Sequence, residues 1–387
     1  MYYQLINEAK YYEFNNINIL ETLNNKDKVV IIDISTSNLT QLPNLDKFVN
    51  LKYLYCYNNQ LTQLPELPDN LETLFCSHNQ LTQLQQLPNS LTHLNCNNNL
   101  LTQLPQLPNN LIALECYHNK LIQLPHLPFN LEKLSCHNNR LTQLPNLPII
   151  LNYLDCSYNE LIELPKLPEN LKDLLCNYNQ LTQLTQLNKL NKLNKLPINL
   201  QNLNCGNNKL LELPKLSDIL IKLYCTNTKL TKLPKLSIYL KDLDCSYNEL
   251  TQLPILPTNL IYLNCASNLL SRLPKLSIYL KELNCSNNEL TQLPNLPTNL
   301  IYLNCASNLL SRLPKLPFML KSLFCYNNNK KLIKHIIHCK SLDINKKYNK
   351  YRYIDKLNDL LNYKIENYYY FSIINYYKEL NSYNFSI

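Results

Sequence analysis

Regularly spaced cysteines are the first residues in this sequence that could do chemistry. Seven cysteines from Cys56 to Cys176 follow one another every twenty residues, and seven more do so from Cys205 to Cys325. A zinc site needs short paired spacings with histidine, and a cysteine nucleophile needs a neighbouring base. No histidine recurs beside these cysteines. The spacing therefore favours one small, buried, inward-facing residue in each unit of a repeat.

An asparagine stands three residues after almost every one of these cysteines. Asn79 follows Cys76 and Asn99 follows Cys96, and the same pair recurs along the chain. A buried amide must be hydrogen-bonded, and stacked units can supply the backbone partners. We therefore expect both rows, represented by Cys76, Cys96, Asn79 and Asn99, to be structural ladders. Thr228 replaces the asparagine in one unit, which predicts a local weak point.

Other chemistry is poorly supported by the sequence. His335 and His338 have helical i, i+3 spacing next to Cys339, but no second cluster of ligands accompanies them. A surface helix with incidental histidines is favoured over a metal site. We expect no catalytic residues, no cofactor and no metal.

The elements that carry these ladders form a repeat. Residues 71–84 read LETLFCSHNQLTQL, which resembles the leucine-rich-repeat pattern LxxLxLxxNxL with cysteine for the third leucine. Residues 104–108, LPQLP, resemble the short LPxLP subclass. That subclass is known from bacterial effector proteins and from paralogous sets in large DNA viruses of amoebae, so the resemblance implies an effector or host-interaction role.

Fold class follows from the repeat. The stretch around Leu74 predicts a short parallel strand, and the proline-containing segment predicts an extended or polyproline-like path. The chain holds a single glycine, so its turns need other residues, and asparagine can adopt the left-handed conformation. We expect an α/β repeat solenoid, a leucine-rich-repeat superhelix of about fifteen coils. It has one continuous parallel β-sheet on the concave face, an extended convex side and short helical caps.

Three regions are predicted. Residues 1–28 form an N-terminal helical cap, and residues 29–329 form the array, whose first, atypical coil has Ile34 at the cysteine position. Residues 177–205 make an enlarged coil, because a triplet of Leu-Asn-Lys has expanded there. Residues 330–387 are rich in Tyr, Asn and Lys, and are either a helical cap or a separate basic, aromatic contact surface.

Charge and hydropathy restrict the classes of partner. The net charge is +9, and most of the excess lies in residues 330–387 rather than in a basic stripe along the array, which disfavours nucleic-acid binding. No apolar run approaches the ~18 residues of a membrane span, and the N-terminus does not resemble a secretory signal. We expect no membrane partner and a reducing, cytoplasmic location.

The surface left for function is the concave face. If Leu74 and Cys76 point inward, then Thr73, Phe75 and Ser77 point outward and His78 lies at the edge. Large side chains in these rows are the candidate partner-binding residues, because aromatic residues are enriched in binding hot spots. They are Tyr53, Tyr55, Tyr57, Phe75, His78, Tyr117, Tyr224, Phe324 and Tyr326. The alternative for those nearest the N-terminus is packing beneath the cap.

The sequence therefore predicts a non-enzymatic protein–protein interaction scaffold whose partner is a protein of unknown identity. Two alternatives remain. The first is a substrate receptor or component of a ubiquitin-ligase system, acting through terminal segments that include Cys339. The second, weaker alternative is nucleic-acid binding through the basic C-terminal tail.

Overall fold

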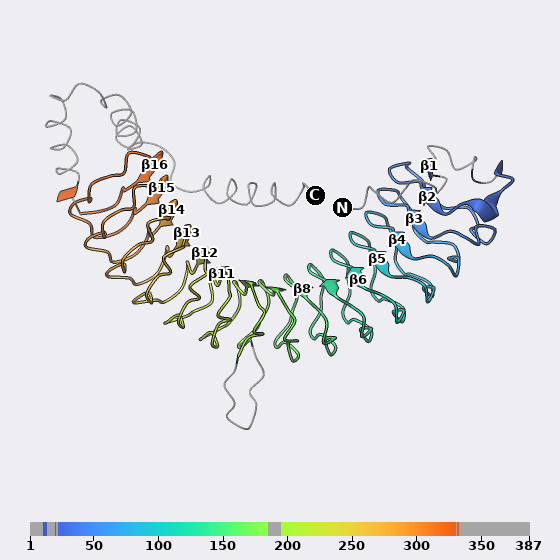
Figure 1. Cartoon of the computed structure of the whole chain (residues 1–387), viewed down its shortest axis with the longest axis horizontal. Helices are drawn as coiled ribbons and strands as arrows, with labels where there is room; N and C mark the ends of the chain where they lie inside the picture. Colours follow the sequence, from blue (N-terminus) through green and yellow to red (C-terminus); the bar gives the residue numbers. More distant parts are fainter. Residues whose placement is uncertain (1–10, 14–19, 21, 185–194, 330, 333–387) are drawn as a thin grey trace, which may run out of the picture.

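The chain forms an arc of stacked coils, with one sheet lining its inner face (Figure 1). This computed structural model describes residues 11–13, 20, 22–184, 195–329 and 331–332. Within them, sixteen parallel strands pair in sequence order, so every strand lies between its chain neighbours. The predicted fold class, a leucine-rich-repeat solenoid with one parallel sheet, is confirmed.

Each strand is three residues long. The strands are β1 (Tyr11–Glu13), β2 (Ile31–Asp33), β3 (Tyr53–Tyr55), β4 (Thr73–Phe75), β5 (His93–Asn95), β6 (Ala113–Glu115), β7 (Lys133–Ser135), β8 (Tyr153–Asp155), β9 (Asp173–Leu175), β10 (Asn202–Asn204), β11 (Lys222–Tyr224), β12 (Asp242–Asp244), β13 (Tyr262–Asn264), β14 (Glu282–Asn284), β15 (Tyr302–Asn304) and β16 (Ser322–Phe324). Register follows the repeat, with Leu74 opposite Leu94. Corresponding side chains of successive coils are therefore stacked in rows along the arc.

The core of each coil is built from leucines and one cysteine. Leu71, Leu74, Cys76 and Leu81 are fully buried, and the same positions are buried in the neighbouring coils. Between β2 and β16 the described connecting segments contain no helix. This follows from the two prolines and the lack of helical periodicity in the LPxLP segment. Fourteen described cysteines are buried and unbridged.

The two irregular parts of the array keep the strand register. The β9 and β10 strands pair with Leu174 opposite Leu203, across the enlarged coil; the inserted residues 185–194 lie outside the described residues. Within the predicted N-terminal cap, β1 is a strand that pairs with β2, Leu20 is fully buried, and a 3-10 helix, η1, spans Lys26–Lys28. The sheet thus extends one strand beyond the predicted array.

Every ladder asparagine joins two coils. The Asn99 Nδ2 group donates to the carbonyl oxygens of Cys76 (3.0 Å), Cys96 (3.1 Å) and Asn97 (3.2 Å). Its Oδ1 atom accepts from the backbone N–H of Leu81 at 2.9 Å. The side chain thereby satisfies the carbonyl groups of Cys76 and Cys96 and the N–H of Leu81, and it adds a bond to the carbonyl of Asn97, which also accepts from the N–H of His78.

Thr228 gives its coil a different backbone. Its N–H and the N–H of Leu230 both donate to Oδ1 of Asn248, at 3.2 and 3.0 Å. The next residue, Lys229, has φ of 79°, whereas the described coils with a ladder asparagine keep that position at negative φ. The first coil has the same backbone conformation at this point, since Ser37 occupies the ladder position and the next residue, Asn38, has φ of 55°. A hydroxyl in the ladder is therefore accompanied by a left-handed residue, which costs ~1 kcal/mol when that residue is lysine.

We expect Thr228→Asn to stabilise the protein by about 1–2 kcal/mol, since it supplies the missing bonds between coils and lets Lys229 return to negative φ. Asn208 and Asn248 occupy this position in the two adjacent coils, so the amide fits. Urea unfolding measures the change. The matched control is Thr231→Asn, at an exposed position of the same coil, which should be neutral. Equal or lower stability of Thr228→Asn would show that the threonine is not a defect.

Candidate functional site

Burial decides which side chains of the concave face a partner can reach. In the β4 coil, Thr73 and Ser77 are buried, Phe75 is half-buried and His78 is exposed. This coil therefore offers Phe75 and His78, and not the three outward side chains that strand alternation predicts. A strand of only three residues ends at Phe75, so alternation no longer governs the exposure of Ser77.

The aromatic residues predicted near the N-terminus do gather. Tyr53, Tyr55, Tyr57 and Phe75 are all half-buried, and the rings of Tyr55 and Phe75 meet edge to face with centroids 5.4 Å apart. Strand β2 pairs alongside β3. The rings thus belong to the second and third coils of the array and remain partly accessible on its concave face.

The candidates at the C-terminal end are far from this group. Tyr224 is half-buried, while Phe324 and Tyr326 are exposed at the last strand. Phe324 packs near Tyr302, with ring centroids 5.7 Å apart. At ~4.8 Å per strand, the thirteen steps from β3 to β16 span ~60 Å of sheet. The predicted residues therefore do not form one site.

Strands β6 to β8 lie midway along the arc (Figure 1), and a polar and aromatic cluster lies on their coils. We call it the central cluster; its members are Glu115, Tyr117, Lys133, His137, Tyr153 and Asp155. Lys133 is at its centre, since its Nζ atom lies 2.6 Å from Oε1 of Glu115 and 5.7 Å from the ring centroid of Tyr153. Three consecutive coils are thereby linked by an ion pair and a cation–π contact.

His137 adds a second set of contacts to the central cluster. Its ring stacks on Tyr117, with centroids 4.2 Å apart. Its Nδ1 atom lies 3.1 Å from Oδ2 of Asp155 and 3.2 Å from Oγ of Ser135. The serine and the carboxylate approach the same ring nitrogen, whereas a proton relay uses the two nitrogens for the two partners. This geometry orients the imidazole and does not assemble a catalytic triad.

Burial shifts the pKa values of tyrosines and histidines in and near the central cluster. Burial and then the carboxylate of Asp155 raise the pKa of Tyr153, and burial raises the pKa of Tyr117. Burial lowers the pKa of His93 and His118 below the ordinary histidine value. Near neutral pH the phenols are therefore hydrogen-bond donors and these two imidazoles are uncharged.

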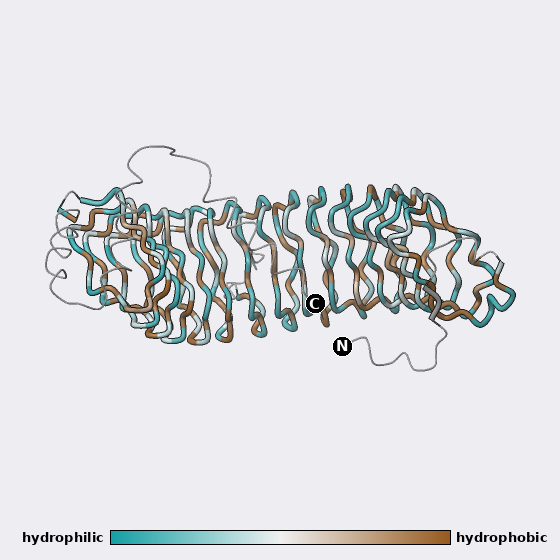
Figure 2. Tube along the Cα trace, turned by 90° about the horizontal axis from the view of Figure 1, so that it is seen from above, coloured by the Kyte–Doolittle hydropathy of each residue, from teal (hydrophilic) through white to brown (hydrophobic). Residues whose placement is uncertain are grey.

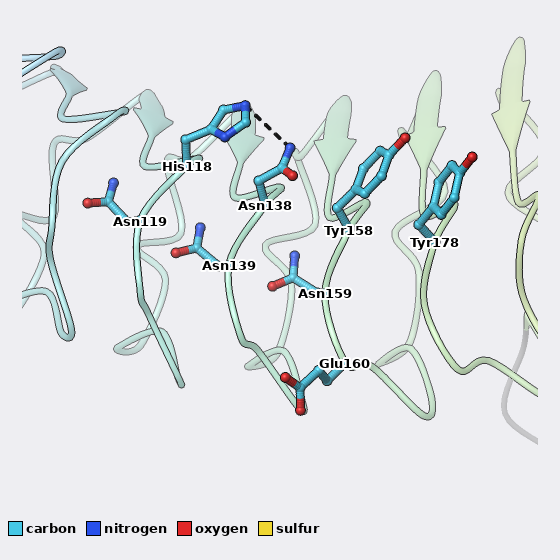
Figure 3. Close-up of a pocket in the computed structure, with 8 residues that line it drawn as sticks. All are labelled: His118, Asn119, Asn138, Asn139, Tyr158, Asn159, Glu160 and Tyr178. Atoms are coloured by element: carbon cyan, nitrogen blue, oxygen red, sulfur yellow. Dashed lines mark hydrogen bonds between the residues drawn. The ribbon is translucent and has the colours of Figure 1, made fainter. Parts of the chain in front are cut away.

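The residues three positions after strands β6 to β9 form a second group, which we call the aromatic edge: His118, Asn138, Tyr158 and Tyr178 (Figure 3). It borders the central cluster, because the ring centroids of His118 and His137 lie 5.5 Å apart. Tyr158 and Tyr178 stack with ring centroids 4.2 Å apart, and Asn138 Nδ2 lies 3.4 Å from Nε2 of His118. An open hollow of about 580 Å³ lies among these four residues and Glu160. The aromatic edge is therefore a shallow, open surface, unlike the deep apolar pockets that enclose small ligands.

Backbone conformation makes the two tyrosines unusual. Tyr158 and Tyr178 have φ of 51° and 54°, a left-handed region that favours asparagine over bulky residues. Equivalent positions elsewhere in the array hold mostly asparagine or serine, and Tyr247 is the one further tyrosine among the described coils. Large rings at this position are not needed to make the turn, so they are candidates for contact with a partner.

Only part of this region could be predicted from the sequence. Tyr117 was predicted, whereas Lys133, His137 and Asp155 were missed. Tyr158 and Tyr178 were missed too, although His78 was predicted at the equivalent position of the β4 coil. The signal was present, because a coil-by-coil alignment places tyrosines in the column of His78, where asparagine and serine prevail.

Thiol and metal chemistry find no support among the described residues. Burial raises the pKa of the Cys76 thiol to about 12 and that of Cys96 well above its ordinary value, so both stay protonated. In the described part of the chain, no three His, Cys, Asp or Glu side chains are placed to hold a metal ion. His335, His338 and Cys339 lie outside it. The described residues also include no helix long and apolar enough to cross a bilayer.

Twenty-residue coils, a parallel concave sheet and inward cysteine and asparagine rows define a leucine-rich-repeat solenoid. YopM from Yersinia enterocolitica WA-314 is similar, with 34% identity and a TM-score of 0.61 over 79% of each chain. YopM from Yersinia pestis, a leucine-rich effector protein, has 34% identity and a TM-score of 0.69 over 78% of this chain and 87% of that one. The chain belongs to the leucine-rich-repeat family, as its repeat predicts.

A third solved structure agrees on the fold alone. The functional domain of InlJ from Listeria monocytogenes, which includes a cysteine ladder, has 24% identity and a TM-score of 0.52 over 79% of this chain and 67% of that one. Comparisons with protein-family models and with curated proteins find no match.

Proposed function

We propose that the protein is a non-enzymatic interaction scaffold that binds a protein partner on its concave face, centred on the central cluster and the aromatic edge. The observation that carries the proposal is the gathering of charged, histidine and aromatic side chains on adjacent coils of one sheet. Aromatic and charged side chains of this kind form binding hot spots when a partner covers them. Extended concave surfaces are also what solenoids offer to partners.

Two features favour binding over catalysis. The described thiols are buried and protonated, so they are poor nucleophiles. The His137 imidazole shares one nitrogen between Ser135 and Asp155, so this histidine is not arranged as the base of a nucleophile–base pair.

The biological setting proposed for this scaffold is that of an effector or host-interaction protein in a reducing cytoplasm. The 34% identity to YopM, a leucine-rich effector protein, supports the first part. Fourteen unbridged cysteines support the second, since free thiols persist in reducing compartments.

The test is affinity capture with variants that change only the concave surface. We expect Tyr158→Ser/Tyr178→Ser, and separately Lys133→Glu, to lower recovery of the specific partner at least tenfold. Serine already occupies the equivalent positions Ser267 and Ser307, so the first variant should fold normally.

A matched control uses the convex side of the same region. Ile122→Thr/Ile162→Thr removes two exposed apolar side chains at positions where most coils hold threonine, and partner recovery should not change. Recovery that is unaffected by the concave variants, or lost equally in the control, would reject the concave face as the binding surface.

A further inference from the structure

A second surface runs along one edge of the array, away from the concave face. A two-residue turn lies six and seven residues before each cysteine, and half of the exposed large apolar side chains of the described residues occupy it. They are Val49, Phe129, Ile149, Ile150, Ile198, Ile219, Ile238, Tyr239, Ile278, Tyr279, Phe318 and Met319. Because the coils are in register, these turns stack along one edge, and Figure 2 shows apolar turns gathered there in the C-terminal half.

Three coils, each separated from the next by one other coil, repeat the same pattern of lysines and apolar residues. Residues 235–241 and 275–281 both read KLSIYLK, and residues 315–321 read KLPFMLK. Each places an exposed apolar pair between two lysines. Both apolar residues differ in the third copy but stay apolar. We call these three segments the apolar–basic edge; the coils between them have Thr-Asn in the turn.

The first residue of each apolar pair contributes little to packing, because Ile238, Ile278 and Phe318 are 64%, 63% and 75% exposed. The first two turns are held by a serine. Ser237 Oγ donates to the carbonyl oxygen of Asp218 at 2.8 Å and accepts from the N–H of Tyr239 at 3.1 Å, and Ser277 makes the same two bonds in its coil. The side chains therefore project from a rigid backbone and are available to a partner.

Charge along the array favours an acidic partner at this edge. Residues 195–329 hold fourteen Lys or Arg and seven Asp or Glu, whereas residues 22–184 hold nine and thirteen. The apolar–basic edge lies wholly in the positive half. Lysines flank each apolar pair on both sides, which suits a partner with one apolar stripe between two acidic rows.

The spacing matches an α-helix. Coils stack at ~4.8 Å, so alternate turns are ~10 Å apart, and seven residues of an α-helix rise ~10.5 Å. A hollow of about 330 Å³ between coils, lined by Ile219, Ile221, Tyr239 and Lys241, has room for an inserted side chain. A lipid surface would need no such spacing and no hollow.

We propose that the apolar–basic edge binds an acidic amphipathic helix of a protein partner. Leucine-like residues at i, i+7 and i+14 of the helix contact the apolar pairs at residues 238–239, 278–279 and 318–319, and its flanking carboxylates pair with the lysines. This surface is separate from the central cluster, so its test and that of the concave face succeed or fail independently.

The test uses a designed peptide as the probe. It is a fluorescein-labelled helix of three heptads with leucines on one stripe and glutamates on both flanks, and its binding to the full chain is followed by fluorescence anisotropy. We expect the peptide affinity to fall at least tenfold between 50 and 500 mM salt. The reason is that salt screens exposed charge pairs, and the Debye length is already only about 10 Å at 0.1 M. A helix with lysine for glutamate is the charge-reversed control.

The turns of the intervening coils supply the replacement residues for a matched variant, since they hold Thr-Asn where the apolar–basic edge holds apolar pairs. Changing residues 238–239, 278–279 and 318–319 to Thr-Asn copies the intervening turns and should lower peptide affinity at least tenfold. Ile255→Asn removes an exposed apolar residue outside the edge, as in the equivalent Asn295, and should change affinity less than twofold.

Three results would overturn the proposal: no binding of the glutamate peptide, equal binding of the lysine peptide, or undiminished binding to the Thr-Asn variant. Binding to phosphatidylserine vesicles without binding of the glutamate peptide would assign the edge to a membrane surface instead.

Discussion

The array is expected to unfold in alkali within a narrow interval that begins near pH 9. The fourteen described cysteines of the repeat lie in the core, and burial raises the pKa of these thiols above the ordinary value of 9.0, as for Cys136 and Cys245. The unfolded chain releases those protons near pH 9, whereas the folded chain retains them. Folding therefore becomes coupled to the uptake of protons from an increasingly alkaline solution.

The direction and size of this loss of stability follow from the linkage between proton binding and folding. A thiol whose folded-state pKa is raised contributes stability that is complete below its unfolded pKa and is lost as the pH rises from there toward the folded value. Each thiol costs ~1.4 kcal/mol per pH unit in that interval. The slope grows with the number of coils that unfold together, and even four thiols lose about 5 kcal/mol per pH unit, which is at the lower end of the usual stability of a domain, ~5–15 kcal/mol.

Circular dichroism measured against pH gives the midpoint of this unfolding transition. The steepness of the transition gives the number of protons released on unfolding. The double variant Cys136→Ala/Cys156→Ala should release two fewer protons on unfolding. An exposed change such as Ile122→Thr should leave the count unchanged. A shallow transition that releases one or two protons would contradict the model of buried, protonated thiols.

Period and residue type were sufficient to predict the fold. A buried cysteine and leucines at fixed positions in twenty residues leave one arrangement that covers every core side chain, which is a stack. The burial of the cysteines could be predicted in the same way, because a small apolar side chain suits an inward position. Strand β1 was not predicted, since Tyr11–Glu13 lacks the repeat pattern and pairs only because the edge of β2 is available.

The site was harder to predict than the fold, for physical reasons. The contact between Lys133 and Glu115 depends on which rotamers two long side chains adopt across neighbouring strands. Burial of Thr73 and Ser77 depends on the size of the side chains around them. The left-handed residue of each turn precedes the ladder asparagine and need not be asparagine itself, as Tyr158 shows. Residue type alone does not encode these features.

The second large effect concerns the asparagine ladder. We expect Asn99→Ala to lower the free energy of unfolding by about 2–3 kcal/mol. The change removes one of the two amide donors to each of the carbonyl oxygens of Cys76 and Cys96, which keep their bonds from Asn79 and Asn119. It also removes the acceptor that serves the buried N–H of Leu81, and a buried backbone group left without a partner costs ~1–3 kcal/mol.

Urea unfolding of Asn99→Ala and of Asn99→Asp separates the two halves of this effect. Aspartate retains the acceptor for Leu81, but it places a buried carboxylate against the carbonyl oxygens of Cys76 and Cys96, so the loss should persist in it. Asn110→Ala is the matched control, because its exposed amide makes one bond, to the carbonyl oxygen of Asn89 at 2.9 Å. It should cost less than ~1 kcal/mol.

The position of the change also matters, because a solenoid coil is stabilised only by its neighbours. Asn99 joins the β4 and β5 coils, so its loss weakens one interface within the array and leaves the others intact. Hydrogen exchange should then show faster opening from β1 to β4 than from β6 to β16. Uniform acceleration in all coils would mean that the array unfolds as a single cooperative unit, and that the ladder stabilises the whole arc rather than each interface separately.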